Sequence, residues 1–321
     1  MGRTLVDEAG RLAGLAVLLM AHGAPTAEED IEAYLRNIRA GRQPSPGEVQ
    51  ELRERYQKIG GRSPLLDITR SQASALEKNL SGAGLGTRVY VGMKYWHPYV
   101  RDLISQIYRD GFRRVLALVM TPLSPRPSIM GYRQALCDAR EVSQGDLEIH
   151  LIESWYDHSL LHTAVAEKIS RALKQFPGSA REKVEVVFTA HSLPQRILEL
   201  NDPYPEQFHA FCRAVADLSR IDRWSLAYQS AGRTDGKWLR PSIQELLEEL
   251  SRDPDTLRRN VLIVPIGFVA DHLEVLYDLD IEAQAFSTAR GLTLKRTESL
   301  NASRTFISAL ADIVVDNCQR N

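Results

Sequence analysis

The chain alternates short apolar runs with longer stretches in which apolar residues recur every three or four positions. Several short runs are continuously apolar, which is typical of strands in a parallel sheet covered by helices on both faces. The longer stretches have the periodicity of amphipathic helices. This pattern predicts eight strands, over residues 15–21, 88–93, 115–121, 147–153, 184–190, 225–229, 260–266 and 292–296.

Helix-start and helix-stop residues frame the stretches between these strands. Ser45, Pro46 and Glu48 have the spacing of a capping box with proline at the first helical position, and Gly60 and Gly61 end that helix. The stretch before it begins near Thr26 with acidic residues, as expected of a helix N-terminus. Helices are predicted over residues 26–41, 45–61, 65–80, 98–111, 128–142, 159–175, 205–219, 241–251, 271–283 and 302–318.

Strand–helix alternation along the whole chain predicts an α/β fold with right-handed crossovers. The order also repeats, because "VLLMAHGAP" at residues 17–25 has the outline of "VVFTAHSLP" at 186–194. We therefore expect two similar Rossmann-like domains, each a four-stranded parallel sheet flanked by helices. The polar segment "KQFPGSAREK" suggests a boundary that assigns residues 1–175 to the first half and 176–321 to the second. The C-terminal helix is a candidate to pack back on the first half.

The composition narrows the class of protein. A length of 321 residues suits two domains, and 40 basic against 41 acidic residues leave no electrostatic footprint for nucleic acid. Three widely separated cysteines support neither a disulfide framework nor a zinc or iron–sulfur site, and a reducing cytoplasm is the expected location. The apolar run 12–21 is too short to span a bilayer and is interpreted as a buried strand, not a signal peptide or transmembrane segment.

Two histidines lie where ligands bind in open α/β sheets, just beyond the carboxyl ends of strands. They are His22 and His191, one in each predicted half. A histidine at a strand end also commonly satisfies backbone carbonyls, so the position alone leaves both interpretations open.

Three carboxylates, Glu274, Asp278 and Glu282, are spaced four apart on a predicted helix that is otherwise apolar. This spacing puts them on one face, where they repel each other. A cation site or a proton path is the functional interpretation, and an acidic surface ridge is the alternative. His272 is a further candidate ligand, but a continuous helix would turn it away from Glu274.

His191 and Glu274 follow strands of the same predicted half and are expected to converge. One imidazole with one carboxylate suits a borderline divalent metal such as Fe²⁺, Co²⁺ or Zn²⁺. Two protein ligands would hold the ion loosely, whereas a structural site is closed by four. The pair therefore predicts a site that passes a metal on. Arginines on the first two helices, Arg39 and Arg55 among them, are either a solvated face or an anion anchor.

Four long segments resemble the ferrochelatase family: "RYQKIGGRSPL", "AHSLPQRILELNDPYPEQ", "YQSAGRTDGKWLRPS" and "PIGFVADHLEVLYDLDIEA". The similarity runs in order from about residue 15 to residue 305. The wording "QSAGRT" and "FVADHLEVLYD" is most similar to the bacterial branch that acts on coproporphyrin III.

The resemblance implies a porphyrin cleft between the two domains and insertion of Fe²⁺, as substrate, without a redox cofactor. It implies that His191 and Glu274 are the metal-handling pair, and that Asp278 and Glu282 guide metal or protons or hold a second divalent cation. It also implies transient protein partners of the haem pathway. The residues that it places at the porphyrin are His22, Arg39, Arg55, Tyr56, Ser63 and Tyr132.

Two positions depart from the family pattern. His22 stands where many relatives carry a tyrosine, and Ala40 stands where some carry a second arginine. The resemblance leaves protoporphyrin IX as an alternative substrate. A cobalt chelatase for an early corrinoid precursor fits the full length and the "QSAGRT" segment less well. A non-catalytic tetrapyrrole carrier would need the ring anchors but not Glu274 and its carboxylate line.

Overall fold

The computed structural model describes residues 14–82, 86–143, 147–232, 236–255 and 259–319. The chain divides into two compact units, the first formed by residues up to Leu160 and from Asn301 onward, the second by Leu161–Leu300. Helix α7 (Ser159–Leu173) therefore lies almost wholly in the second unit, whereas the sequence places it in the first half. Helix α12 (Arg304–Gln319) belongs to the first unit, where Gln72 Nε2 donates to the carbonyl of Asn301 at 3.0 Å.

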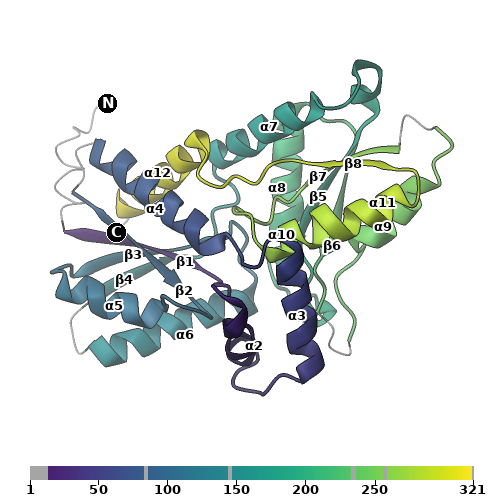
Figure 1. The fold of residues 1–321 in the computed structure, drawn as a ribbon. Coiled ribbons are helices and arrows are strands. Elements are labelled where there is room, and N and C mark those ends of the chain that lie inside the picture. Colours follow the sequence, from purple (N-terminus) through teal and green to yellow (C-terminus); the bar gives the residue numbers. More distant parts are fainter. Residues whose placement is uncertain (1–13, 83–85, 144–146, 233–235, 256–258, 320–321) are drawn as a thin grey trace, which may run out of the picture. The chain divides into compact units, whose positions relative to one another are not determined.

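The first unit is built on a four-stranded parallel sheet in the order β2-β1-β3-β4 (Figure 1). Its strands are β1 (Leu15–Ala21), β2 (Arg88–Met93), β3 (Arg114–Val119) and β4 (Glu148–Ile152). Besides α12, its helical segments are η1 (Glu28–Asp30), α2 (Ile31–Ile38), α3 (Pro46–Lys58), α4 (Leu65–Gly82), α5 (Val100–Arg109) and α6 (Arg126–Ser143).

The second unit repeats this arrangement with the order β6-β5-β7-β8, again all parallel. Its strands are β5 (Glu185–His191), β6 (Trp224–Gln229), β7 (Asn260–Val264) and β8 (Thr293–Arg296). Its helical segments, besides α7, are η2 (Gly178–Lys183), η3 (Gln195–Ile197), α8 (Tyr204–Ser219), α9 (Ile243–Ser251), α10 (Leu273–Leu276), η5 (Asp278–Ala283) and α11 (Gln284–Thr288). The two-sheet α/β architecture predicted from the sequence is confirmed.

The first strand of each unit is second in its sheet and is buried on both faces. All seven residues of β1 are buried, and so are the first six of β5. Each fully buried aliphatic side chain contributes about 1.5–3 kcal/mol of hydrophobic stabilisation. The continuously apolar runs in the sequence therefore correspond to central strands. Polar groups that follow these runs lie at the edge of each sheet where the strands end.

Local capping chemistry explains where one predicted helix begins and why another is divided. The Ser45 hydroxyl accepts from the Glu48 amide at 3.3 Å, and the Glu48 carboxylate accepts from the Ser45 amide at 2.8 Å, which confirms the capping box. The helix predicted over 26–41 is instead a short 3₁₀ turn followed by α2. The Asp30 carboxylate accepts from the amides of Thr26 and Ala27, each at 3.1 Å.

The helix predicted over 271–283 is wrong in both its start and its continuity. His272 has an extended backbone, with φ −159° and ψ −177°, so α10 begins only at Leu273. A π-helical turn, η5, follows, in which the Glu282 amide donates to the Tyr277 carbonyl five residues earlier at 3.0 Å. Turns of this kind inside helices are frequent at functional sites.

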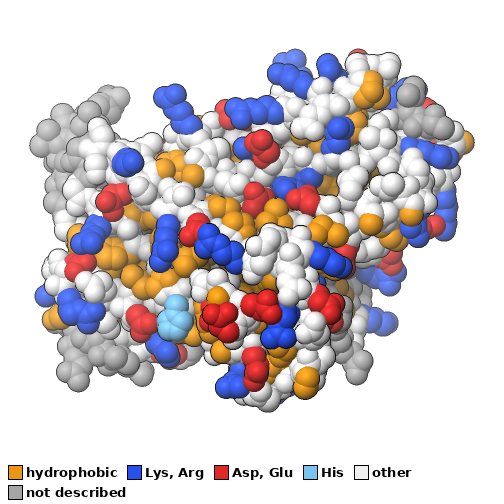
Figure 2. Space-filling model, viewed as in Figure 1, with side chains coloured by type: hydrophobic (Ala, Val, Ile, Leu, Met, Phe, Trp, Pro, Cys, Tyr) orange, Lys and Arg blue, Asp and Glu red, His pale blue; other side chains and the backbone are white. Residues whose placement is uncertain are grey.

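Acidic and basic side chains are interspersed on the face shown in Figure 2, in keeping with the net charge of −1. Among the described residues, no helix has both the length and the apolar character needed to cross a membrane.

Close packing between two strand ends gives a test of the second unit. Gly267 follows β7, and its amide donates to the Thr189 carbonyl at 3.1 Å. A Cβ at this glycine would lie 2.8 Å from the Ala190 Cβ and 2.9 Å from its Cα. We expect Gly267→Ala to lower the free energy of unfolding by about 1–3 kcal/mol, because the strand end that carries His191 must shift.

The matched control is Gly47→Ala, since a Cβ at this helical glycine meets no atom within 4 Å. We expect it to be neutral or stabilising by up to about 1 kcal/mol. Denaturant unfolding of both variants measures the difference, and equal effects from the two substitutions would contradict the packing argument.

Candidate functional site

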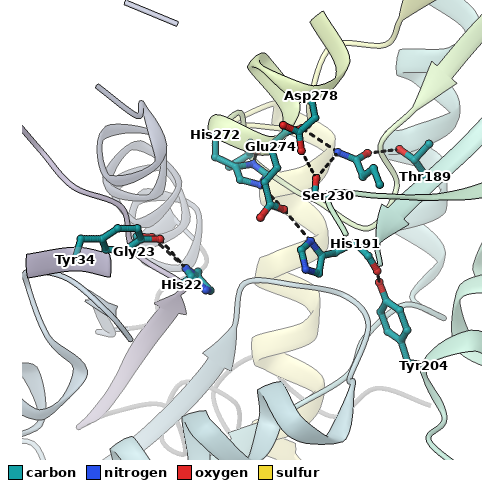
Figure 3. A network of polar contacts seen from close by, with 12 residues as sticks. His22, Gly23, Tyr34, Thr189, His191, Tyr204, Ser230, His272, Glu274 and Asp278 are labelled. Atoms are coloured by element: carbon teal, nitrogen blue, oxygen red, sulfur yellow. Dashed lines mark hydrogen bonds and ion pairs between the residues drawn. The ribbon is translucent and has the colours of Figure 1, made fainter. Parts of the chain in front are cut away.

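A histidine and a carboxylate meet at the strand-end edge of the second sheet. His191 is the last residue of β5, and Glu274 lies in the first turn of α10. The Nδ1 atom of His191 is 3.0 Å from Oε2 of Glu274 (Figure 3). Both side chains are about one-third exposed. The expected convergence of these two residues is therefore present in the structure.

His191 is held once at its backbone and once at its ring. Its backbone carbonyl accepts from the Tyr204 hydroxyl at 2.7 Å, and its Nδ1 is occupied by Glu274. No other described residue hydrogen-bonds to its Nε2. Because a carboxylate partner fixes the proton of a neutral imidazole on the nitrogen that it contacts, Nε2 is left as the atom that can bind a metal or accept a proton.

His272 lies close to the same carboxylate, contrary to the expectation from a continuous helix. Its Nε2 is 3.8 Å from Oε2 of Glu274, and its Nδ1 donates to the Ala270 carbonyl at 2.9 Å. The extended backbone at His272 brings the ring back toward Glu274. Glu274 thus lies between two imidazoles.

The other two carboxylates of the predicted line differ in environment. Asp278 is buried at 6% exposure and accepts a hydrogen bond from the Ser230 hydroxyl, whereas Glu282 is exposed. Within the described parts of the chain, no group of three or more His, Cys, Asp or Glu side chains is arranged to hold a metal ion.

The charges of the pair favour an imidazolium next to a carboxylate. Burial disfavours protonation of His191, but the charge and hydrogen bond of Glu274, together with the charge of Asp278, hold the pKa of His191 above its ordinary 6.5. Burial would raise the pKa of Glu274, but the charge and hydrogen bond of His191, and then the nearby His272, hold it well below 4.5. Below the raised pKa of His191, a divalent metal that binds its ring must displace a proton.

In the first unit, His22 follows β1 and is exposed. The Tyr34 hydroxyl lies 3.3 Å from its Nδ1 and donates to the Gly23 carbonyl at 3.1 Å (Figure 3). Its ring also packs against that of Tyr95, with centroids 4.7 Å apart. These contacts fix the histidine at the end of the central strand.

Lys94 lies between Tyr95, whose ring packs against His22, and Tyr132, another predicted site residue. The Lys94 ammonium lies 4.8 Å from the ring centre of Tyr95 and 4.9 Å from that of Tyr132. Gly131 makes room for it, since a Cβ there would lie 2.1 Å from Nζ. Tyr132 is buried, and this burial raises the pKa of its hydroxyl. The structure thus brings Tyr132 and His22 into one cluster through Lys94 and Tyr95.

The remaining predicted porphyrin contacts lie on or beside α2 and α3. Arg39 caps the end of α2 and pairs with Glu48, whose pKa is lowered to about 2 by hydrogen bonds from Ser45 and by Arg39. Arg55 and the buried Tyr56 lie on α3. Ser63 is buried before α4, where its hydroxyl accepts from the Leu65 amide at 3.3 Å.

Several residues at these sites were missed when the sequence was considered by itself. Lys94 and Tyr95 follow the end of β2, and Gln229 and Ser230 lie at the end of β6. The rule that led to the two histidines, a polar side chain at the carboxyl end of a parallel strand, applies equally to these four. Lysine, tyrosine, glutamine and serine are common at loop entries, so their residue types gave no additional signal.

The ion pair predicts a pH-dependent contribution to stability. The raised pKa of His191 stabilises the fold below pH 6.5 and this effect is lost as pH rises through the folded-state pKa. The lowered pKa of Glu274 stabilises above pH 4.5 and is lost as pH falls through its folded-state value. The contribution of the pair therefore peaks between these two pH values.

We expect Glu274→Gln to reduce the free energy of unfolding more at about pH 5.5 than at about pH 9, by about 1 kcal/mol or less because the pair is partly solvated. Thermal or denaturant unfolding at both pH values measures this difference. The control is Glu206→Gln on an exposed position of α8, for which we expect the same small effect at both. A deficit of Glu274→Gln that does not change with pH would contradict the ion pair.

Comparisons with known proteins identify the family of this chain. The ferrochelatase family model matches residues 14–318. A ferrochelatase of Herpetosiphon aurantiacus is 39% identical over 300 residues, which cover 93% of this chain and 97% of that protein. The coproporphyrin III ferrochelatase of Bacillus subtilis is 36% identical over 308 residues, which cover 95% of this chain and 98% of the relative.

Among solved structures, SirB from Bacillus subtilis with Fe³⁺ is similar with a TM-score of 0.59 and 11% identity, over 95% of both chains. That likeness shows a chelatase fold. The family model, by contrast, spans both sheets and includes the strand ends that carry His191 and His22. Because the family model matches nearly the whole chain and these two relatives are more than 30% identical over almost its full length, the chain belongs to the ferrochelatase family, the enzymes that insert ferrous iron into a porphyrin.

Proposed function

We propose that this ferrochelatase inserts Fe²⁺ into coproporphyrin III, giving Fe-coproporphyrin III, in cytoplasmic haem biosynthesis. The support for this substrate is the segments "QSAGRT" and "FVADHLEVLYD" and the relatives named coproporphyrin III ferrochelatase. The observation that supports the chemistry is the hydrogen-bonded pair of His191 and Glu274.

His191 and Glu274 are proposed to receive Fe²⁺ and to manage the protons of the reaction. Metal insertion replaces two pyrrole N–H protons with one Fe²⁺ ion, so the site must bind a cation and accept protons. With Glu274 on Nδ1, the Nε2 of a neutral His191 is suited to either task near neutral pH. Glu274 then serves as metal ligand and as the next acceptor for the proton that His191 gives up.

The anchors of the macrocycle are proposed to be Arg39, Arg55, Tyr56 and Ser63 for the carboxylates and Tyr132 for the ring edge. A porphyrin with four propionates needs more polar anchors than one with two. Arg39 already pairs with Glu48, so a propionate on Arg39 would exchange one carboxylate partner for another. Binding of these remote groups can offset the strain of holding the ring distorted for metallation.

Asp278 and Glu282 are proposed as the outer carboxylates of this site. The buried Asp278 accepts from Ser230 and the exposed Glu282 faces solvent, which suits the two ends of a proton path. A second divalent cation at these carboxylates stays the alternative, and the chemistry needs no redox cofactor because iron enters and leaves as Fe²⁺.

The first experiment is anaerobic Fe²⁺ insertion with coproporphyrin III and protoporphyrin IX as competing substrates. We expect a higher kcat/KM for coproporphyrin III and a loss of about 100-fold or more in His191→Ala, because both metal binding and proton transfer depend on this ring. His209→Ala, an exposed histidine on α8, is the control that should retain wild-type activity.

A preference for protoporphyrin IX would overturn the proposed substrate and leave the enzyme class unchanged. That alternative has support in the 39% identical relative, which is named simply ferrochelatase. Wild-type activity in His191→Ala would overturn the proposed roles of the pair. A tetrapyrrole carrier would bind the porphyrin without accelerating metallation by the wild-type protein.

His22 is proposed to ligate the iron of the product. Its ring is fixed by Tyr34 and Tyr95 but remains exposed at the end of β1. We expect His22→Ala to shift the visible absorption bands of the protein–product complex and to raise the product dissociation constant by about 10-fold, which corresponds to about 1.4 kcal/mol of binding free energy. Identical product spectra for wild type and His22→Ala would contradict a role as axial ligand.

A further inference from the structure

The side chain of Gln229 is connected to every element that carries the metal-handling residues. Gln229 is the last residue of β6 and only 2% exposed. In the parallel pairing of β5 with β6 its Cα lies opposite that of His191. Its backbone carbonyl accepts from the Ser192 amide at 2.7 Å, which ties β6 to the residue directly after His191.

Both the oxygen and the nitrogen of the Gln229 side-chain amide have hydrogen-bond partners. Its Oε1 accepts from the Thr189 hydroxyl at 2.7 Å. Its Nε2 donates to the backbone carbonyl of Glu274 at 2.9 Å and lies 3.4 Å from the Ser230 hydroxyl. Because the Glu274 backbone carbonyl can only accept, Nε2 of Gln229 must face it, and this places Oε1 toward the Thr189 hydroxyl.

Ser230 extends the same chain of hydrogen bonds to the buried carboxylate. Its hydroxyl donates to Asp278, and the dashed lines in Figure 3 follow this path from Thr189 to Asp278. The backbone of Ser230 has φ +59°, a left-handed conformation that a residue other than glycine adopts at a cost of about 1 kcal/mol. The hydrogen bonds of its hydroxyl on both sides offset that cost.

We propose that Gln229 is the positioning residue of the metal-handling pair, which sets Glu274 at hydrogen-bonding distance from His191. The physical reason is the break in the helix. Glu274 lies in a helical segment of only four residues, between the extended His272 and a π turn, so few helical hydrogen bonds hold it. The hydrogen bond from the Gln229 side-chain amide holds the backbone of Glu274 in place. A buried neutral amide can do this without adding a charge that would compete for Fe²⁺. This inference rests on the proposed roles of His191 and Glu274.

The test is Gln229→Met, which keeps the length and packing of the side chain but removes its three hydrogen bonds. We expect the KM for Fe²⁺ to rise about 10-fold or more, as for other groups that orient metal ligands, while the KM for the porphyrin stays within about twofold. A residue with a purely structural role would lower the melting temperature and the active fraction and leave both KM values unchanged.

The matched control is Gln72→Met in the first unit. Gln72 is also fully buried, and its Nε2 likewise donates to a backbone carbonyl, that of Asn301 at 3.0 Å. We expect this substitution to lower stability and to leave the KM for Fe²⁺ unchanged. If Gln229→Met folds poorly, Thr189→Val replaces it. This substitution removes only the hydroxyl that donates to Oε1 of Gln229, and we expect a smaller rise in the same KM.

Measuring His191→Ala in parallel distinguishes failure of the positioning role of Gln229 from failure of the proposed roles of His191 and Glu274. If His191→Ala is inactive while Gln229→Met and Thr189→Val keep the wild-type KM for Fe²⁺, the positioning role is overturned and the roles of the pair stand. If His191→Ala is fully active, the roles of the pair fail, and the positioning role fails with them.

Discussion

Burial of one central strand in each unit on both faces is the constraint on which the structure depends. Strands β1 and β5 are covered by helices and flanked by neighbouring strands, so a polar side chain within them must find a partner inside the sheet. Thr189 meets this requirement through Gln229. Polar side chains that face away from the core therefore lie at the strand ends, and His22 and His191 lie there in the same position of two sheets with the same strand order.

Three elements of the second unit place polar groups at the edge where its strands end. β5 supplies an imidazole, the broken helix after β7 supplies a carboxylate, and β6 supplies an amide and a hydroxyl. A continuous helix after β7 would carry His272 away from Glu274. The extended residue and the π turn instead leave Glu274 between two imidazoles. A pair rather than a closed set of ligands suits a metal that is substrate and must leave, because a four-ligand site would retain it.

The two units share a strand order, but the side chains around their strand-end histidines differ. At the end of β1, His22 is held by a tyrosine hydroxyl and an aromatic ring, with a lysine cation close to that ring. At the end of β5, His191 is held by a carboxylate. Against the effect of burial, the charge and hydrogen bond of Glu274 hold the pKa of His191 above its ordinary value. Two equivalent positions thus offer two imidazoles of different character.

The sequence by itself determined the eight strands, the repeated order, the capping box of α3 and the pairing of His191 with Glu274, because each follows from local periodicity or from the strand-end rule. The assignment of α7 to the second unit, the break before Leu273, the approach of His272 and the contacts of Gln229 and Lys94 were decided only by the tertiary structure. The physical reason is that a backbone hydrogen bond or a ring contact between distant segments leaves no periodic trace in the sequence. An apolar face does, because burial acts on every third, fourth or consecutive residue.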